Sequence, residues 1–353
     1  MSRGRGSLSN LPGRFLRTET LFEDGECGVG GQQSGQVDAR ARPTHYHGEQ
    51  CKSLIVSNRS PDLPFQRSIN PYRGCEHGCI YCYARPTHSY LELSPGLDFE
   101  TEIFCKDNAA AVLRAQLEQP GYRCEVLALG TATDPYQPIE RRRKLTRQLL
   151  ALCLELRQPV MLITKSNLVL RDLDLLAPMA AEGLVTVAVS VTTLDNRIKS
   201  RLEPRATAGS KRLEAIGGLS AAGVPVSLLY APVIPFINDH ELEAIVAAAA
   251  DAGAGSGHYV MLRLPHEVNP LWQQWLAAHY PDRAGKVMAV LRDLGDGREY
   301  QSDFFRRQRG QGPWAALIAQ RFGLALKRHG LTDERVPLRT DLFVGANRQW
   351  SLF

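Results

Sequence analysis

The chain has 353 residues, of which 44% are hydrophobic, so it is long enough to bury one large core or two modest ones. Its net charge of +5 is small for this length and is weak evidence for a polyanionic partner. The N-terminus has no apolar run of the kind that a secretory signal needs, and glycines and prolines break the long uncharged stretch at 215–238. These features argue against a membrane protein and predict a soluble protein of the cytoplasm.

Residues 1–60 are predicted to form an irregular or disordered N-terminal segment. Glycines at 25–31 and a run of Arg and Pro up to Pro43 leave most of this segment poor in core-forming side chains. His45 and His47 are interpreted as solvated side chains in preference to metal ligands.

Residues 61–270 alternate short apolar runs with helical patterns, as α/β proteins do. The apolar runs predict six strands, at 68–72, 125–129, 160–163, 185–191, 224–229 and 258–264. Helices are predicted at 109–117, from about 138 to 158, and at 168–181, 211–222 and 239–252, with one further extended piece at 102–105. Six such units indicate a partial (β/α)6 barrel with its active site at the carboxyl ends of the strands.

After residue 270 the alternation stops, and residues 271–353 are predicted to be a C-terminal helical extension. Its helices are expected at 271–280, 286–293 and 314–329, followed by a strand-like ending at 338–353.

Aromatic and basic residues mix in this extension, which is typical of a nucleic-acid surface. They are Phe304, Phe305, Arg306, Arg307, Arg309, Trp314, Arg321, Lys327 and Arg328. A basic helix face beside core positions at Leu317, Ile318, Phe322 and Leu326 would give the same pattern, and it is the favoured interpretation.

Three cysteines, Cys75, Cys79 and Cys82, are spaced C-x3-C-x2-C and fit a single loop around one inorganic centre. Zinc usually has four N/S ligands and an ordinary iron–sulfur cluster has four thiolates. Three ligands leave one metal position that can bind a substrate-like ligand. A zinc knuckle completed by His77, or three structural thiols, are the alternatives. The other cysteines are scattered, as expected of reduced intracellular thiols, at Cys27, Cys51, Cys105, Cys124 and Cys153.

Small and hydroxylic residues follow several of the predicted strands, and such a ring at the barrel rim could hold a polar cofactor. Thr131 follows the second strand, Lys165 the third, and Ser190 ends the fourth. Each hydroxyl alone is typical of a helix cap. The Lys165 ammonium should face an anion, either a cofactor carboxylate or a helix acid such as Asp172, and the spacing favours neither.

The cysteine spacing, with the aromatic Tyr81 just before the last cysteine, resembles the signature of the radical S-adenosylmethionine (SAM) enzymes. The resemblance implies an open (β/α)6 barrel in which three cysteines hold a [4Fe-4S] cluster. It further implies that SAM chelates the fourth iron and is cleaved reductively to a 5′-deoxyadenosyl radical. An electron donor of the flavodoxin or ferredoxin type is then expected.

Within that superfamily, the chain from about 68 to 264 resembles the branch of spore photoproduct lyase, also labelled DNA-repair-photolyase-like. The similarity lies in the block 70–84 and in short motifs at 164–165, 190–192, 203–204 and 223–232. It implies that Tyr81, Lys165 and Ser190 contact SAM.

The chain departs from this branch at Thr131, which stands where the lyase carries a hydrogen-donor cysteine. Cys124 precedes the strand and is therefore at the wrong end for the rim. The glycine-glycine-glutamate cofactor strip of many radical enzymes is replaced by residues 130–133, so Thr131 is counted among the SAM contacts. Repair of thymine dimers by the lyase's mechanism is therefore not expected.

The leading interpretation is a radical SAM enzyme that acts on an unidentified substrate. The alternatives are a nucleic-acid lyase or modifying enzyme related to spore photoproduct lyase and, from another class, a metal-stabilised nucleic-acid-binding module.

Overall fold

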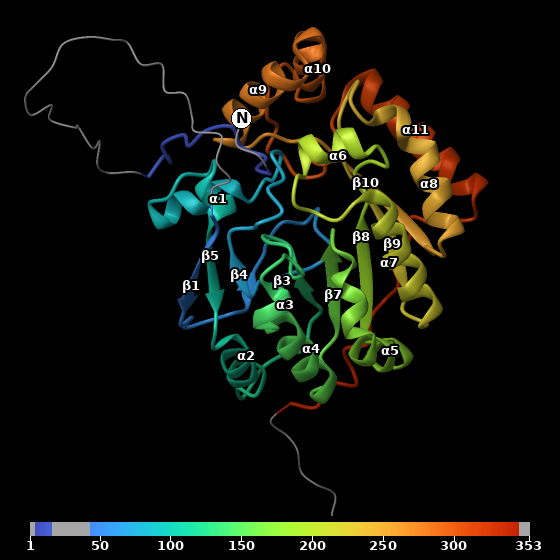
Figure 1. The fold of residues 1–353 in the computed structure, drawn as a ribbon. Coiled ribbons are helices and arrows are strands. Elements are labelled where there is room, and N and C mark those ends of the chain that lie inside the picture. The colour runs from blue at the N-terminus through green and yellow to red at the C-terminus, as the bar shows by residue number, and fades with distance from the viewer. Residues whose placement is uncertain (1–3, 16–42, 346–353) are drawn as a thin grey trace, which may run out of the picture.

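The computed structural model describes residues 4–15 and 43–345 (Figure 1). Its centre is a seven-stranded sheet in the order β10-β9-β8-β7-β6-β3-β2. All of its strand pairs are parallel except that of β2 with β3. The strands are β2 (Val56–Ser57), β3 (Arg67–Ile69), β6 (Leu127–Leu129), β7 (Val160–Thr164), β8 (Val185–Ser190), β9 (Val226–Val233) and β10 (Ser256–Met261).

The six parallel strands are those predicted from the apolar runs, and their spatial order follows the chain from β3 to β10. Runs rich in Val, Leu and Ile form such strands because both faces of a parallel sheet are covered. Val185, Val187 and Val189 of β8, for example, have no exposed surface. Because β10 and β2 end the sheet without pairing with each other, the partial barrel is confirmed and stays open along one side.

Helices that connect consecutive strands pack beside one another around the sheet (Figure 1). They are α2 (Ala109–Leu117), α4 (Leu145–Glu155), α5 (Leu173–Ala181), α7 (Gly209–Ala221) and α8 (Leu242–Asp251). The helix expected from about 138 is split into α3 (Glu140–Arg143) and α4, because Lys144 takes a positive φ of 53°. The helix expected at 168–181 begins as a 3-10 turn, η2 (Asn167–Asp172). The helix expected at 239–252 likewise begins as a 3-10 turn, η3 (Asp239–Glu241). Three short elements were not predicted: η1 (Arg85–Leu91), α1 (Asp98–Thr101) and α6 (Asn196–Leu202).

A second, three-stranded sheet has the order β1-β5-β4. Its strands are β1 (His45–Glu49), β4 (Tyr72–Arg73) and β5 (Glu102–Lys106), of which β5 was expected as an extended piece. Strand β1 lies in the segment that was predicted to be irregular. The sequence did not predict it because backbone pairing with β5, and not an apolar pattern, holds it in place. His45 and His47 are exposed, as expected, and a ring nitrogen of each lies within 2.8 Å of a Glu102 carboxylate oxygen.

The first described residues also differ from the predicted irregular segment. Arg5, Gly6 and Ser7 are buried against the barrel. The Glu100 carboxylate accepts from the backbone N–H groups of Gly6 and Ser7, and the Arg5 guanidinium donates to the Glu100 carbonyl. The glycine-rich stretch at 25–31, and with it Cys27, lies outside the described residues.

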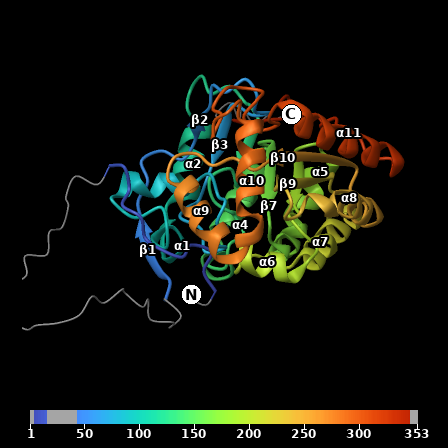
Figure 2. The same ribbon diagram turned by 90° about the horizontal axis from the view of Figure 1, so that it is seen from above.

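Three helices form the C-terminal extension, α9 (Val268–His279), α10 (Pro281–Leu294) and α11 (Gly312–Arg328), as predicted. Helices α9 and α10 lie over the loops at the carboxyl end of the sheet (Figure 2). Helix α11 packs on β10, with the Tyr259 and Phe322 rings 4.9 Å apart.

Two expectations for the extension are wrong. Leu317, expected in the core, is 47% exposed, whereas Ile318, Phe322 and Leu326 are buried as expected. The described part of the predicted strand-like ending, 338–345, contains no strand, and 346–353 lie outside the described residues. The division of the chain at residues 60 and 270 stays a prediction.

The segment at 303–309, named here the seam loop, bridges the two edges of the open barrel. The backbone N–H of Met261, at the end of β10, donates to Gln308 O at 2.8 Å. On the opposite edge, Arg307 forms a two-pronged ion pair with Asp62, between β2 and β3, at 2.7 and 2.6 Å. The Asp62 side chain is only 3% exposed, so this ion pair closes the side of the barrel with little access to water.

Replacing Arg307 should therefore weaken the fold. Burial opposes ionisation of Asp62, but the Arg307 hydrogen bonds outweigh it and hold the pKa below its ordinary value of 3.8. We expect Arg307→Ala to lower the free energy of unfolding by about 1.5–3 kcal/mol at neutral pH, measured by urea denaturation. Since the ionised carboxylate is the stabilised form, this difference should shrink as the pH falls below 3.8 through the folded-state pKa.

Arg306→Ala is the matched control, because Arg306 is exposed and makes no ion pair with any described acid. It should change the stability by less than about 0.5 kcal/mol. Equal stability of the Arg307 variant and wild type would contradict the bridging role of the ion pair.

Candidate metal centre

The cysteine loop runs from β4 to η1, and its backbone is fixed on two sides. The N–H of Cys75 donates to Phe99 O at 2.9 Å, and that of Ile80 donates to Leu202 O at 3.1 Å. Gly78 has a positive φ of 67°, and a Cβ atom there would lie 2.7 Å from Glu100 Oε2. A glycine is therefore required between the first two cysteines for both conformational and steric reasons.

The three motif thiols are a chemically suitable ligand set for an iron–sulfur cluster. Cys75 and Cys79 are each 7% exposed, and Cys82 is partly buried. Burial raises the pKa of all three thiols, and the negative charges of Asp134 and Glu203 raise those of Cys75 and Cys79 further. Without a cation the thiols therefore stay protonated, whereas bound iron supplies the positive charge that makes thiolates stable.

A single zinc ion fits the site less well. No group of three His, Cys, Asp or Glu side chains within the described ranges converges as a site for one metal ion. The thiolates of a [4Fe-4S] cluster each bind a different iron, so they need not converge on one point. His77, the fourth ligand of the zinc alternative, instead has its Nδ1 atom 3.4 Å from Asp134 Oδ2.

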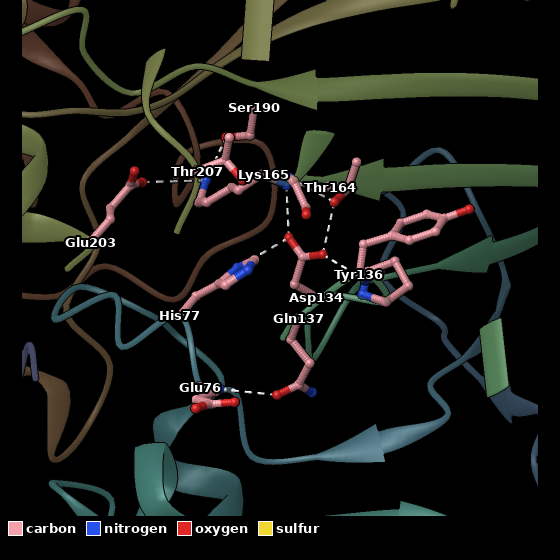
Figure 3. A network of polar contacts seen from close by, with 12 residues as sticks. Glu76, His77, Asp134, Tyr136, Gln137, Thr164, Lys165, Ser190, Glu203 and Thr207 are labelled. Atoms are coloured by element: carbon pink, nitrogen blue, oxygen red, sulfur yellow. Dashed lines mark hydrogen bonds and ion pairs between the residues drawn. The ribbon is translucent and has the colours of Figure 1, made fainter. Parts of the chain in front are cut away.

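Asp134 connects the cysteine loop to the ends of two barrel strands (Figure 3). It follows β6 and accepts hydrogen bonds from the Thr164 hydroxyl at 2.8 Å and the Lys165 backbone N–H at 2.7 Å, just beyond β7. Burial opposes its ionisation, but the His77 charge and these hydrogen bonds outweigh it and lower the pKa of the carboxyl group. Asp134 therefore places Lys165 at the rim beside the cysteine loop.

The Lys165 ammonium lies in the middle of this rim. It donates to Ser190 Oγ at 2.5 Å, lies 3.8 Å from Glu203 Oε1, and stands 5.8 Å from the centre of the Tyr81 ring. The alternative that pairs Lys165 with Asp172 is wrong, because Asp172 is held by arginines and Tyr136 instead.

Glu203 is the buried anion on which this cluster of side chains depends. Tyr81 Oη donates to it, as does Thr192 Oγ1 at 2.7 Å, and the Arg212 guanidinium pairs with it. Its side chain has no exposed surface, which alone would raise its pKa. The charges of Arg212 and Lys165 outweigh burial and lower the pKa to about 2, so Glu203 is ionised.

Three of the four predicted cofactor contacts lie together in the structure, and the fourth, Thr131, lies apart from them. Tyr81, Lys165 and Ser190 share one network around Glu203. Thr131 belongs to another, in which its hydroxyl accepts from Asn70 Nδ2 at 3.3 Å and its carbonyl accepts from the Tyr83 hydroxyl.

Sequence reasoning gave no role to Asp134, Glu203 or Arg212. The loops that carry the two acids were singled out from the sequence. Asp134 directly follows residues 130–133, and Glu203 is the first residue of the short motif at 203–204. Arg212 lies in a predicted helix, where an arginine normally indicates an exposed face.

The described cysteines outside the motif lie away from this network. Cys105 is on β5, Cys153 is on α4, and Cys51 follows β1. Cys124 precedes β6 and is 3.6 Å from Gln158 Oε1. All seven described cysteines are free thiols.

Comparison with known proteins identifies the family. The model of the radical SAM superfamily matches residues 69–249, which contain the cysteine loop and the parallel strands β6, β7, β8 and β9. The chain belongs to the radical SAM superfamily. It is 37% identical to an uncharacterised protein of Mycobacterium tuberculosis (strain ATCC 25618 / H37Rv) over 252 residues, which cover 70% of this chain and 74% of the relative.

Two solved structures share the fold at low sequence identity. A mutant of spore photoproduct lyase matches with a TM-score of 0.57 and 15% identity, covering 81% of each chain. The same lyase complexed with dinucleoside spore photoproduct matches with a TM-score of 0.55 and 14% identity, again over 81% of each chain.

As a member of this superfamily, the protein is an enzyme that uses a [4Fe-4S] cluster and SAM to generate a 5′-deoxyadenosyl radical. It needs an electron donor and a substrate. Membership favours the enzyme over the metal-stabilised binding module. None of the described helices is long and apolar enough to cross a membrane.

Replacement of single cysteines should separate the motif from the other thiols. We expect Cys75→Ala, Cys79→Ala and Cys82→Ala each to lose the brown colour and most of the iron after anaerobic reconstitution, measured by iron and sulfide analysis. Cys124→Ala and Cys153→Ala are the matched controls and should load like wild type. Full iron in a motif variant, or loss of iron in a control that is folded by circular dichroism, would show that the ligands are assigned wrongly.

Proposed function

We propose that Cys75, Cys79 and Cys82 hold the [4Fe-4S] cluster of a radical SAM enzyme whose substrate is still to be identified. The observation that carries this proposal is the position of the three thiols in one rim loop, next to the partly buried ammonium of Lys165. When bound, the cluster and SAM together supply a carbon radical that removes a hydrogen atom from the substrate.

Lys165 is proposed to bind the carboxylate of SAM. Its ammonium carries three N–H donors, and the two protein acceptors are Ser190 Oγ at 2.5 Å and Ala231 O at 3.4 Å. Glu203 already pairs with Arg212, so it does not need Lys165 as its sole cation. The ammonium is therefore held in place with donor capacity to spare, and Tyr81 and Ser190 are proposed to line the same site.

Thr131 is the weakest of the proposed SAM contacts, because its hydrogen bonds go to Asn70 and Tyr83 on another side of the rim. A threonine hydroxyl is also a poor hydrogen-atom donor, and none of the other described thiols joins the rim network. A reaction that returns hydrogen from a cysteine is therefore not proposed. An electron donor of the flavodoxin or ferredoxin type and a cytoplasmic location stay predictions.

Release of 5′-deoxyadenosine tests the proposal. Reconstituted wild-type protein with SAM and a strong reductant should form 5′-deoxyadenosine, and Cys79→Ala should not. Lys165→Ala should load normal iron but need roughly ten- to a hundredfold more SAM for half-maximal release, because a charge-assisted hydrogen bond contributes about 1.5–3 kcal/mol.

Lys211→Ala is the matched control, since Lys211 is exposed and pairs only with Glu214 on the same helix. No product from wild type would refute the proposed function. An unchanged SAM requirement in Lys165→Ala would instead assign this lysine to the Glu203 ion pair alone.

A nucleic-acid substrate is the second candidate, and the aromatic and basic side chains at the rim favour it. Phe304 and Phe305 of the seam loop are 47% and 67% exposed. Phe305 also has a positive φ of 66°, which a non-glycine residue rarely adopts and which is commoner at functional sites. Nearby, the Arg263 guanidinium stacks 4.5 Å from the centre of the exposed Tyr83 ring, and Tyr83 directly follows the last motif cysteine. Exposed aromatic rings beside arginines bind unstacked bases and phosphates.

On α11, Arg321 is held by Glu243 at 2.7 Å and does not extend this surface. Phe322 and Leu326 face the core, which favours the helix-face interpretation at these positions. The seam loop is not helical and exposes its rings. The fold relative that binds a dinucleoside gives further support to this candidate.

Binding of a short fluorescent single-stranded oligonucleotide, followed by anisotropy at low salt, tests the second candidate. The double variant Phe304→Ala/Phe305→Ala should weaken binding at least about fivefold, because stacking on one ring contributes about 1–3 kcal/mol. The control Leu317→Ala/Leu324→Ala removes two side chains of similar exposure, 47% and 59%, from α11 and should bind like wild type. Equal affinity of the two double variants, or binding to anionic vesicles but not to the oligonucleotide, would refute this candidate.

A further inference from the structure

The described N-terminal residues are bound to one buried carboxylate. Gly6 N–H donates to Glu100 Oε2 at 2.9 Å, and Ser7 N–H donates to Glu100 Oε1 at 2.8 Å. The Arg5 guanidinium donates to Glu100 O at 2.7 Å. Glu100 lies in α1 and has no exposed surface, so the N-terminal segment covers it from water.

The same carboxylate is linked to the cysteine loop. Glu100 Oε1 is 2.5 Å from Arg85 Nη2, and both side chains are fully buried. Arg85 in turn donates from Nε to the carbonyl of Cys79 at 2.9 Å. A chain of three polar contacts therefore runs from the N-terminal backbone through Glu100 and Arg85 to the middle cysteine of the motif.

A direct steric contact supports the same connection. A Cβ atom built on Gly6 would lie 1.8 Å from the carbonyl oxygen of Gly78, which is backbone and not a movable side chain. Only glycine at position 6 allows the segment to lie this close to the cysteine loop. Neighbouring contacts fix the segment further along, since Asn10 Oδ1 accepts from Leu97 N–H at 2.6 Å.

A second link reaches the first cysteine. The Arg5 guanidinium donates to Thr44 Oγ1 at 2.7 Å, and Thr44 donates to Glu76 Oε1 at 3.1 Å. Glu76 follows Cys75 directly and is buried. The N-terminal segment therefore lies against the loop at Gly78 and is linked to Glu76 through Thr44.

We propose that residues 4–11 are a clasp that holds the cysteine loop in its cluster-binding conformation and shields it from water, with Gly6 as the positioning residue. The clasp touches the back of the loop and none of the side chains around Lys165. It acts through the loop backbone, so its loss should increase the rate at which the cluster loses iron and should affect SAM binding less. This inference rests on the proposed function, because it assumes that the loop holds the cluster.

The rate at which an anaerobic iron chelator removes iron from the reconstituted protein tests the clasp. Gly6→Ala should still load the cluster but release iron at least about tenfold faster than wild type, which corresponds to about 1.4 kcal/mol. Its thermal unfolding by circular dichroism should stay close to wild type, since the clasp lies outside both sheets. The matched control is Pro12→Ala, at an exposed position directly after the clasp, and it should release iron like wild type.

Amide hydrogen exchange of the wild-type protein provides a second test that needs no variant. If the clasp stabilises the loaded loop, the loaded loop must stabilise the clasp by the same free energy. The Gly6 and Ser7 amides should therefore exchange about tenfold more slowly in cluster-loaded than in cluster-free protein.

Equal iron release from Gly6→Ala, Pro12→Ala and wild type would overturn the clasp, as would identical exchange with and without the cluster. A wild-type protein that loads no cluster would instead overturn the proposed function, so the two failures are distinguishable.

Discussion

Glu203 is the buried charge on which the geometry of the rim depends. A carboxylate without exposed surface is stable only when cations and hydrogen-bond donors replace water, and here Arg212, Lys165 and Tyr81 do so. These partners come from different elements, so the ion pair fixes α7, the end of β7 and the cysteine loop relative to one another. Removal of any one of them would leave the others to rearrange around an uncompensated charge.

The cysteine loop is held by three carboxylates in the same manner. Glu203 holds it through Tyr81, Asp134 lies against His77, and Glu100 acts through Arg85. Each acid has a basic partner, so the surroundings of the loop are close to electrically balanced. An iron–sulfur centre with its thiolates adds negative charge, and a balanced site tolerates it better than a net anionic one would.

Spore photoproduct lyase shares this fold at 15% identity, so the likeness extends to the barrel and not to the chemistry of its rim. The sequence resemblance predicts that Thr131 stands where the lyase carries its hydrogen-donor cysteine, and in this chain the Thr131 carbonyl accepts a hydrogen bond from the Tyr83 hydroxyl. The shared fold therefore positions a radical, and the loops decide what the radical acts on. In this chain the seam loop exposes Phe304 and Phe305, and Tyr83 stacks with Arg263.

The sequence by itself determined the features that local patterns encode. The six parallel strands follow from apolar runs between helical segments, and the proposed metal centre rests on three cysteines within eight residues. Lys165 was recognised because an ammonium directly after a buried strand needs an anion, although Asp172 was a wrong partner for it. Only the tertiary structure shows which carboxylate of the protein lies near this ammonium, because Glu203 is 38 positions away in the chain and comes within 3.8 Å only in the folded barrel. The N-terminal segment shows the same limit: Gly6 and Glu100 are 94 positions apart, and no periodicity marks a glycine that fits against a distant backbone carbonyl. Hydrophobic period and ligand spacing are properties of neighbouring residues, whereas buried charge pairs and close backbone contacts arise only once the chain has folded.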